Sequence, residues 1–265
     1  MNNRLIPLSP TAHRHHGWMS PPDCRFAATD TVAPLLLAEL PSAVAAFPLA
    51  IVRPPDGRAQ LVAVMGLHAG QNLLVDPQGR WLAAYRPACH RAWPFSLQSA
   101  PGDAQRLMLC FNEGSGLLRA APDPARGEAR FFDDQGKMLP HLQKTLEFLE
   151  TCAGNTQLTL GAVAALEAAG LLQPWPGFTG LLRIDEAALA RLNAGQLLAL
   201  RDAHALSLAY ALLLSLPRMA VLQRLLAQQQ AVQPASAAAL AATPDLGLAE
   251  KLFDSGQSDT LKFNW

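Results

Sequence analysis

Apolar positions divide the chain into a strand-rich first part and a helical second part. Leu49–Arg53 and Gln60–Leu67 are rich in Val, Ile and Leu, and they flank the turn sequence Pro54–Gly57. This arrangement predicts a β-hairpin. The segment Leu73–Leu82 is organised in the same way around a central Asp-Pro-Gln-Gly turn. Apolar and polar residues alternate over Gln105–Phe111, which predicts a further strand.

In the second part the apolar spacing becomes helical. Leucines recur at helical spacing over residues 142–149, and a second helix is predicted over residues 156–169. Gly170 follows that helix, and glycine is the preferred residue just past a helix end. A long apolar stripe over residues 196–230 contains Pro217, which is expected to end or kink its first half.

The first segments predict less regular structure. The first thirty residues are polar and Pro-rich, which indicates an extended arm. Pro34 fits the first turn of a short helix, which Pro41 is expected to interrupt. Residues 117–130 contain Pro, Gly and charges and predict a loop, and Phe131-Phe132 predicts a short edge segment.

Strands first and helices second favour an α+β fold over a doubly wound parallel sheet. We expect a single α+β domain over residues 1–230, strand-rich over 1–136 and helical over 137–230. Residues 231–265 are rich in Ala, Ser and Gln and then polar, which predicts a flexible tail with an apolar tip.

Charge and composition narrow the classes of partner. Lys plus Arg and Asp plus Glu number 21 each, and no basic run occurs, so we expect no nucleic-acid partner. Ala205–Leu216 is too short to span a bilayer, and the N-terminus does not read as a signal peptide. We therefore expect a cytoplasmic protein without a transmembrane segment. The four cysteines form no Cys-x-x-Cys motif and are expected to be free, mostly buried thiols.

An aromatic and arginine cluster is the main candidate binding site: Arg80, Trp81, Tyr85, Arg91 and Trp93. Aromatic faces and guanidinium groups bind peptides, carboxylates and aromatic ligands. The alternative is that the aromatic rings fill a core and the arginine side chains lie over them.

Histidines offer a second kind of site. His13, His15 and His16 are the only histidine cluster and, with a carboxylate such as Asp185, predict the alternative function of a metal-dependent, peptide-modifying enzyme. Their spacing matches no known structural metal site, and Asp185 also has the position of a helix N-cap. The sequence holds no P-loop, dinucleotide fingerprint or Gly-x-Ser-x-Gly elbow, so no catalytic residue, metal or cofactor is assigned.

The end of the given sequence is a third candidate. Phe263 and Trp265 stand in its last five residues and suit docking on a partner or on a neighbouring subunit. The alternative is a terminal segment with no binding role.

Several short motifs together resemble the SapC-like family, which is named for a surface-array (S-layer) protein gene. The most specific block runs from Gly66 to Phe95. The motifs that carry the resemblance are His16-Gly17-Trp18, Arg25-Phe26-Ala27, Val32-Ala-Pro-Leu, Ala38-Glu39, Phe47-Pro48, Gly66-Leu67, Gly70-Gln-Asn-Leu, Val75-Asp76-Pro-Gln-Gly79-Arg80-Trp81-Leu82, Tyr85, Pro87-Ala88, Arg91, Pro94-Phe95, Pro174-Trp175 and Arg183-Ile184-Asp185-Glu186.

The resemblance implies little chemistry, because the family has no established reaction to carry over. It implies relatives encoded near TonB-dependent outer-membrane receptors, tryptophan-halogenase-like proteins and cupin-type oxygenases. We therefore expect a non-enzymatic accessory protein that acts on a peptide, a protein client or a partner enzyme, such as an oxygenase or a halogenase-like protein. That role is linked to the bacterial envelope or its outer-membrane receptor systems.

Overall fold

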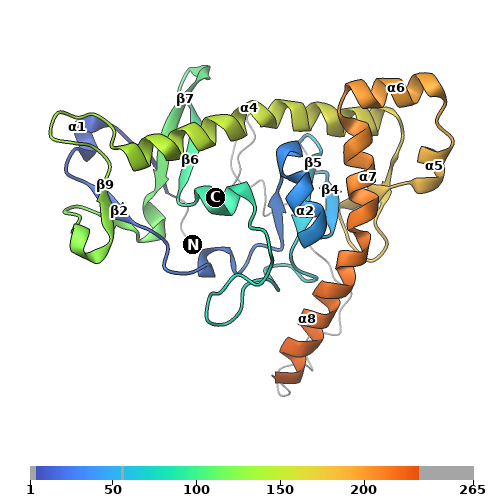
Figure 1. The fold of residues 1–265 in the computed structure, drawn as a ribbon, viewed down its shortest axis with the longest axis horizontal. Helices are drawn as coiled ribbons and strands as arrows, with labels where there is room; N and C mark the ends of the chain where they lie inside the picture. The colour runs from blue at the N-terminus through green and yellow to red at the C-terminus, as the bar shows by residue number, and fades with distance from the viewer. Residues whose placement is uncertain (1–3, 55–56, 233–265) are drawn as a thin grey trace. The chain divides into compact units, whose positions relative to one another are not determined.

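The computed structural model describes residues 4–54 and 57–232, and its fold is mixed α+β (Figure 1). Three antiparallel sheets are described, and the helices lie mainly in the C-terminal part of the sequence, so the predicted fold class is confirmed. The described chain divides into two compact units: unit 1 is residues 4–23 and 89–154, and unit 2 is residues 24–88 and 155–232. The single domain expected over residues 1–230 stays a prediction.

Unit 1 is built from two three-stranded sheets, with strand orders β1-β7-β6 and β8-β2-β9. Its elements are β1 (Leu5–Pro7), α1 (Pro10–His13), β2 (Gly17–Met19), β6 (Phe95–Ala100), β7 (Asp103–Asn112), η3 (Glu113–Ser115), β8 (Leu118–Arg119), η4 (Pro124–Arg126) and β9 (Glu128–Arg130). The predicted extended arm at the start of the chain therefore supplies two sheet strands, and the predicted loop over residues 117–130 contains β8, η4 and β9.

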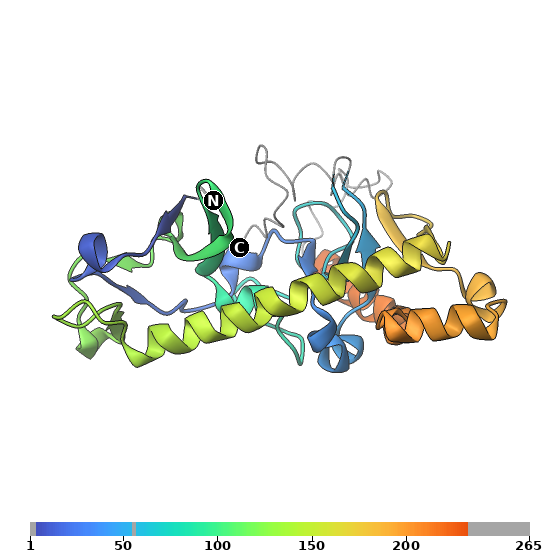
Figure 2. The ribbon, with the colours of Figure 1, turned by 90° about the horizontal axis from the view of Figure 1, so that it is seen from above.

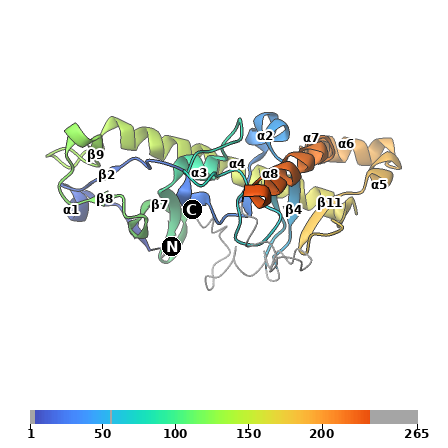
Figure 3. The ribbon, with the colours of Figure 1, turned by 90° about the horizontal axis from the view of Figure 1, so that it is seen from below.

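Unit 2 contains a five-stranded sheet of order β10-β11-β4-β5-β3. Helix α7 packs against β4, β11 and α2, and Figure 3 shows α7 beside these strands. The elements are η1 (Arg25–Ala27), β3 (Val32–Pro34), η2 (Leu37–Glu39), α2 (Leu40–Ala46), β4 (Leu49–Val52), β5 (Gln60–Val64), β10 (Leu172–Pro174), β11 (Leu181–Ile184), α5 (Glu186–Ala190), α6 (Ala194–Asp202), α7 (Ala205–Ser215), η5 (Leu216–Arg218) and α8 (Met219–Val232). Helices α3 (Ala88–Ala92) and α4 (Pro140–Ala168) contribute residues to both units.

Aromatic rings form the core of unit 1. Trp18 stacks on Phe131 with ring centroids 5.2 Å apart, and Phe95 meets the edge of Trp18 at 5.0 Å. Phe131 and Phe132 are fully buried, and Phe132 forms an isolated antiparallel β-bridge with Met138, which agrees with the short strand segment predicted there. Gly17 allows strand β9 to approach, because an added Cβ would lie 2.0 Å from the carbonyl oxygen of Ala129.

Helix α4 is continuous, which corrects the prediction of two helices over residues 142–149 and 156–169 (Figure 2). Gly154 lies near its middle and costs about 1 kcal/mol relative to Ala, a cost that the buried leucines of the helix outweigh. The end of the helix was predicted correctly. Gly170 has a φ of 65°, and its N–H donates to the carbonyl of Glu167.

Prolines test several of the predicted helix and strand boundaries. Pro34 lies in strand β3, so the helix predicted to begin there was wrong. Pro41 instead occupies the first turn of α2, where its missing N–H leaves no hydrogen bond unmade. The hairpin of β4 and β5 is confirmed, and Pro217 lies in the 3₁₀ segment that separates α7 from α8.

One helical run among the described residues is long and apolar enough to cross a membrane by length and composition. It is Ala205–Ala231, with a mean hydropathy of 1.7, and 39% of its most apolar stretch is buried within the protein. A core helix of a soluble protein meets the same criterion, so the predicted absence of a transmembrane segment stays a prediction.

Candidate functional site

Within unit 2, the Arg80–Ala88 segment is fastened by the buried carboxylate of Glu39. Only 5% of Glu39 is exposed. Its Oε1 accepts hydrogen bonds from the Tyr85 hydroxyl at 2.9 Å and the Ala88 N–H at 2.7 Å, and its Oε2 accepts one from the Leu36 N–H at 2.9 Å. A buried charge needs several such donors to offset its lost hydration. Glu39 therefore ties the start of η2 to a segment almost fifty residues later in sequence.

The predicted binding residues of this segment have internal contacts. The indole Nε1 of Trp81 donates to the Tyr85 carbonyl at 2.7 Å. Both rings meet Phe47 edge-on, at centroid distances of 6.4 and 6.3 Å. The Arg80 side chain is exposed, and its Nε pairs with Asp76 Oδ2 at 2.6 Å across the predicted turn. These contacts match the packing alternative considered for the cluster.

Arg91 and Trp93 belong to unit 1. The Arg91 guanidinium lies over the ring of Phe148, 4.9 Å from its centroid, and Trp93 packs against the aromatic core of unit 1. The five predicted binding residues are thus divided between the two units, three in unit 2 and two in unit 1. Their action as one binding surface stays a prediction.

A different feature of unit 2 was missed by sequence reasoning. A hollow of about 290 Å³ opens between η2, the start of α2, the second half of α4 and the start of α7. Its lining is four apolar and three polar side chains: Leu37, Ala38, Leu40, Leu158, Asn155, His204 and Ser207. This volume lies just below the range of about 300–1,000 Å³ usual for small-molecule pockets, so the hollow suits one or two side chains of a partner.

The polar groups of the hollow are fixed by the turns around it. Asn155 Oδ1 accepts the Ala38 N–H at 3.2 Å, which holds η2 against α4. His204 has a φ of 57°, a left-handed conformation that is uncommon for a residue other than glycine. Its carbonyl accepts the Ser207 hydroxyl at 2.9 Å. The amide nitrogen of Asn155 makes no hydrogen bond with another described residue, so it can donate to an occupant.

Large exposed apolar side chains lie beside this hollow. Leu158 is 51% exposed, Tyr210 50% and Leu214 69%. Ser207, Tyr210 and Leu214 are three and four residues apart on α7 and therefore share one face of that helix. We call the hollow together with Tyr210 and Leu214 the α4–α7 face. A group of exposed apolar side chains beside a hollow favours an interaction site.

A comparison with protein families assigns the chain. The sequence profile of the SapC family matches residues 8–222. The chain belongs to the SapC family. No curated protein and no solved structure matches it. The match spans both units and includes every element that lines the α4–α7 face.

The family motifs that carried the resemblance include structural positions of the fold. Ala38-Glu39, Tyr85 and Pro87-Ala88 meet in the Glu39 hydrogen bonds described above. Gly66 of the same SapC motifs allows a close approach, because an added Cβ would lie 1.9 Å from the carbonyl oxygen of Gln71. Contacts within the fold therefore account for the residues at these motif positions, without a role in binding.

The histidine cluster of this SapC-family chain lies in unit 1. The rings of His13 and His16 are 5.5 Å apart, and His13 Nδ1 accepts the Ser9 N–H at 3.2 Å. Burial and the neighbouring His16 lower the pKa of His13. Asp185 lies in unit 2, where it caps α5 by accepting the Ala188 N–H. Within residues 4–54 and 57–232, no group of three or more His, Cys, Asp or Glu side chains is arranged to hold a metal ion.

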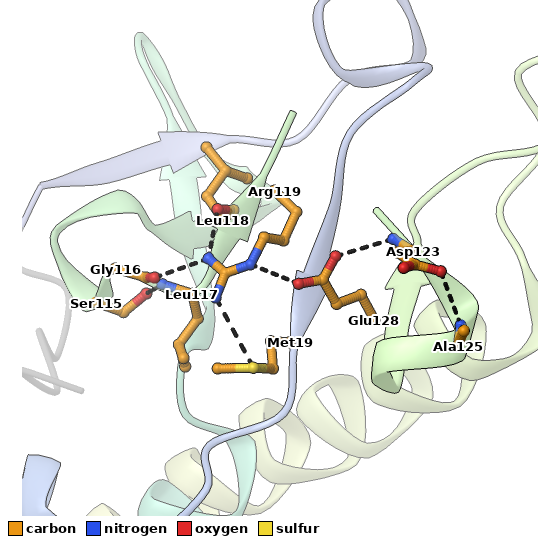
Figure 4. A network of polar contacts seen from close by, with 9 residues as sticks. All are labelled: Met19, Ser115, Gly116, Leu117, Leu118, Arg119, Asp123, Ala125 and Glu128. Atoms are coloured by element: carbon orange, nitrogen blue, oxygen red, sulfur yellow. Dashed lines mark hydrogen bonds and ion pairs between the residues drawn. The ribbon is translucent and has the colours of Figure 1, made fainter. Parts of the chain in front are cut away.

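A second polar network organises the β8-β2-β9 sheet of unit 1 (Figure 4). Glu128 accepts Arg119 Nε at 2.8 Å and the Asp123 N–H at 2.9 Å. The hydrogen bond from Asp123, and then the guanidinium of Arg119, lower the pKa of Glu128. Arg119 also donates to the carbonyls of Gly116 and Leu118. These hydrogen bonds join residues of unit 1 to one another, so we interpret the network as stabilising the fold.

The remaining candidates lie at the end of the sequence. Phe263 and Trp265 stand outside the described residues, as does the predicted tail apart from residues 231 and 232, which end α8. Their docking role stays a prediction.

Proposed function

We propose that this SapC-family chain is a non-enzymatic binding protein that holds a protein or peptide client on the α4–α7 face. The observation that carries the proposal is the grouping of exposed apolar side chains. Six large apolar residues are well exposed in the described chain, and three of them lie on α4 and α7 at this face: Leu158, Tyr210 and Leu214. Isolated exposed apolar residues are ordinary, whereas a group beside a hollow favours binding.

The magnitude of the apolar contribution suits a reversible complex. Burying a fully exposed Leu side chain contributes about 1.5–3 kcal/mol, so covering half-exposed residues contributes roughly half as much each. Leu158, Tyr210 and Leu214 together then contribute on the order of 3 kcal/mol. The rest of the binding free energy has to come from the hollow and from polar contacts at its rim, such as Asn155 and Ser207.

The identity of the client is a proposal that draws on the family resemblance. Genes for outer-membrane receptors, oxygenases and halogenase-like proteins are expected beside those of relatives. We propose a cytoplasmic client of this group, either a partner enzyme or a peptide that it modifies. The surface of Arg80, Trp81, Tyr85, Arg91 and Trp93 is the competing location for the same function.

The experiment is affinity purification of the full chain from its native host at endogenous expression, with quantitative mass spectrometry of the co-purifying proteins. The same purification is repeated with Leu214→Arg and with the control Leu107→Arg. Leu107 is also an exposed leucine, 45% accessible, and it lies on β7 of unit 1. The proposal predicts that a reproducible partner is lost with Leu214→Arg and retained with Leu107→Arg. Equal recovery with both variants would contradict it.

A further inference from the structure

We infer that the client segment received by the α4–α7 face is acidic and amphipathic, with its carboxylates pairing with Arg218 and Arg224. This inference rests on the proposed binding function and names the chemistry of the partner. It follows from the charges along the helical run that α7, η5 and α8 form.

The run carries charge of one sign only. From Ala203 to Val232 the sequence contains no Asp or Glu, and its only arginines or lysines are Arg218 and Arg224. The whole chain, by contrast, balances 21 basic with 21 acidic residues. Two exposed cations with no neighbouring acid in the helix create a local positive potential on an otherwise neutral protein.

Neither arginine is neutralised by another described residue of the protein. The ion pairs of unit 2 use other arginines: Arg53 with Glu167, Arg80 with Asp76 and Arg201 with Asp202. Arg224 donates only a long hydrogen bond, 3.4 Å, to the Ala220 carbonyl of its own helix. Arg218 makes no hydrogen bond or ion pair within the described residues. Both guanidinium groups can therefore bind carboxylates of a partner.

The positions of the apolar and basic side chains along α7, η5 and α8 determine the order of groups expected in the partner segment. Leu214 lies one helical turn beyond Tyr210, Arg218 one turn beyond Leu214, and Arg224 about 9 Å beyond Arg218. A segment lying along this run meets apolar groups at α7 and cations at η5 and α8. Its complement has two apolar side chains near one end and at least two carboxylates over the next 15 Å or so.

An anionic membrane would also offer apolar and acidic groups, but the observations favour a protein. Polybasic segments that recognise anionic lipids usually carry about 4–8 Lys or Arg, whereas this run carries two. Beyond Leu214 the exposed positions of α8 include Gln223, Gln228 and Gln230, which do not form a membrane-facing apolar stripe. The other side of α7 packs against α2, β4 and β11 and so cannot enter a bilayer without loss of that packing.

The test begins with a photo-crosslinker at the apolar end. The full chain is expressed in its native host with p-benzoylphenylalanine in place of Tyr210, irradiated, and the crosslinked segment is identified by mass spectrometry. We expect a protein segment with two apolar residues followed by two or more Asp or Glu. A crosslink to lipid, a crosslinked segment without acidic residues, or no crosslink at Tyr210 overturns the inference.

The crosslinked segment is then synthesised, and its affinity for the full chain is measured by fluorescence anisotropy. Reversal of both charges, Arg218→Glu with Arg224→Glu, is expected to weaken binding roughly tenfold, because it removes two ion pairs and adds two repulsions. A peptide with Lys in place of its acidic residues restores binding to that variant. The control reversal Arg106→Glu with Arg126→Glu, at exposed positions of unit 1, leaves the affinity within about twofold.

The outcomes separate the two proposals. If Leu214→Arg weakens binding of the peptide but the double reversal at Arg218 and Arg224 does not, the acidic partner is refuted and the binding function of the α4–α7 face stands. If neither variant changes the affinity, both proposals are refuted.

Discussion

The two tyrosines of this protein provide a matched pair for testing the Glu39 contacts. Tyr85 donates its hydroxyl to the buried Glu39 carboxylate at 2.9 Å, whereas the Tyr210 side chain is 50% exposed and its hydroxyl makes no hydrogen bond with a described residue. Tyr85→Phe and Tyr210→Phe therefore remove the same atom from two different environments. Tyr85→Phe keeps the ring that packs on Phe47.

The contacts of Tyr85 determine how much stability Tyr85→Phe is expected to lose. A hydrogen bond to a charged group contributes about 1.5–3 kcal/mol, and its loss here leaves a buried carboxylate oxygen with one donor fewer. We expect Tyr85→Phe to lower the free energy of unfolding by about 2 kcal/mol, which corresponds to a fall in Tm of roughly 4–8 °C for a chain of this size. Tyr210→Phe should stay within about 0.5 kcal/mol of the wild type.

The assay is urea unfolding followed by far-UV circular dichroism, with thermal unfolding as a second measure. The comparison is made between the two variants at one pH and one protein concentration. Equal stabilities for Tyr85→Phe and Tyr210→Phe, within about 0.5 kcal/mol, would refute the reasoning that Glu39 fastens the Arg80–Ala88 segment.

Three other predictions concern unit 1 and the cysteines. Glu128→Gln should destabilise the protein at pH 7. The loss of unfolding free energy relative to the wild type should shrink as the pH falls below 4.5, because folding lowers the Glu128 pKa from that value. Urea unfolding of both proteins at several pH values measures this loss. Alkylation of the native protein at pH 8 should modify the partly exposed Cys152 first and Cys110 last, as read by mass spectrometry, because burial raises the pKa of Cys110 to about 11. Gly17→Ala should destabilise the protein by more than about 1 kcal/mol in the same unfolding assay, since its Cβ would clash with strand β9.

Each of these has its own contradicting result. If the difference in unfolding free energy between Glu128→Gln and the wild type stays constant down to pH 3, ionisation of the Glu128 carboxylate is not the source of the stabilisation. Fast alkylation of Cys110 would mean that the native thiol is reachable and ionised. A fully stable Gly17→Ala variant would mean that β2 and β9 can separate without cost.

The parts of the fold that followed from the sequence depend on local signals. Hydrophobic runs around turn residues predicted the β4–β5 hairpin, and Gly170, Asp185 and Pro217 act at helix ends as expected from their backbone chemistry. The errors arose where tertiary packing overrides local preference. Gly154 and Gly161 did not interrupt α4, because a long helix with buried leucines tolerates two glycines.

The candidate site was less predictable from sequence. Trp81 and Tyr85 were chosen for their chemistry, but their polar atoms are used by a carbonyl and by Glu39, a residue that no local pattern connects to them. The α4–α7 face joins Leu37, Leu158 and Ser207, which are far apart in the chain. One signal was present in the sequence: Tyr210 and Leu214 share a helix face with Ser207, and no acidic residue follows them up to Val232.

The most direct test of the central claim is a binding titration with the purified partner and four full-length proteins: the wild type, Tyr210→Ala with Leu214→Ala, Arg91→Ala with Trp93→Ala, and the control Leu107→Ala. Truncation of these two exposed apolar residues at the interface should weaken binding roughly thirtyfold, since each contributes about 1 kcal/mol. The account predicts this loss for the Tyr210 and Leu214 variant alone, with the other two variants close to the wild type. Loss of binding with the Arg91 and Trp93 variant, and full affinity with the Tyr210 and Leu214 variant, would contradict the account and place the client on the aromatic and arginine cluster.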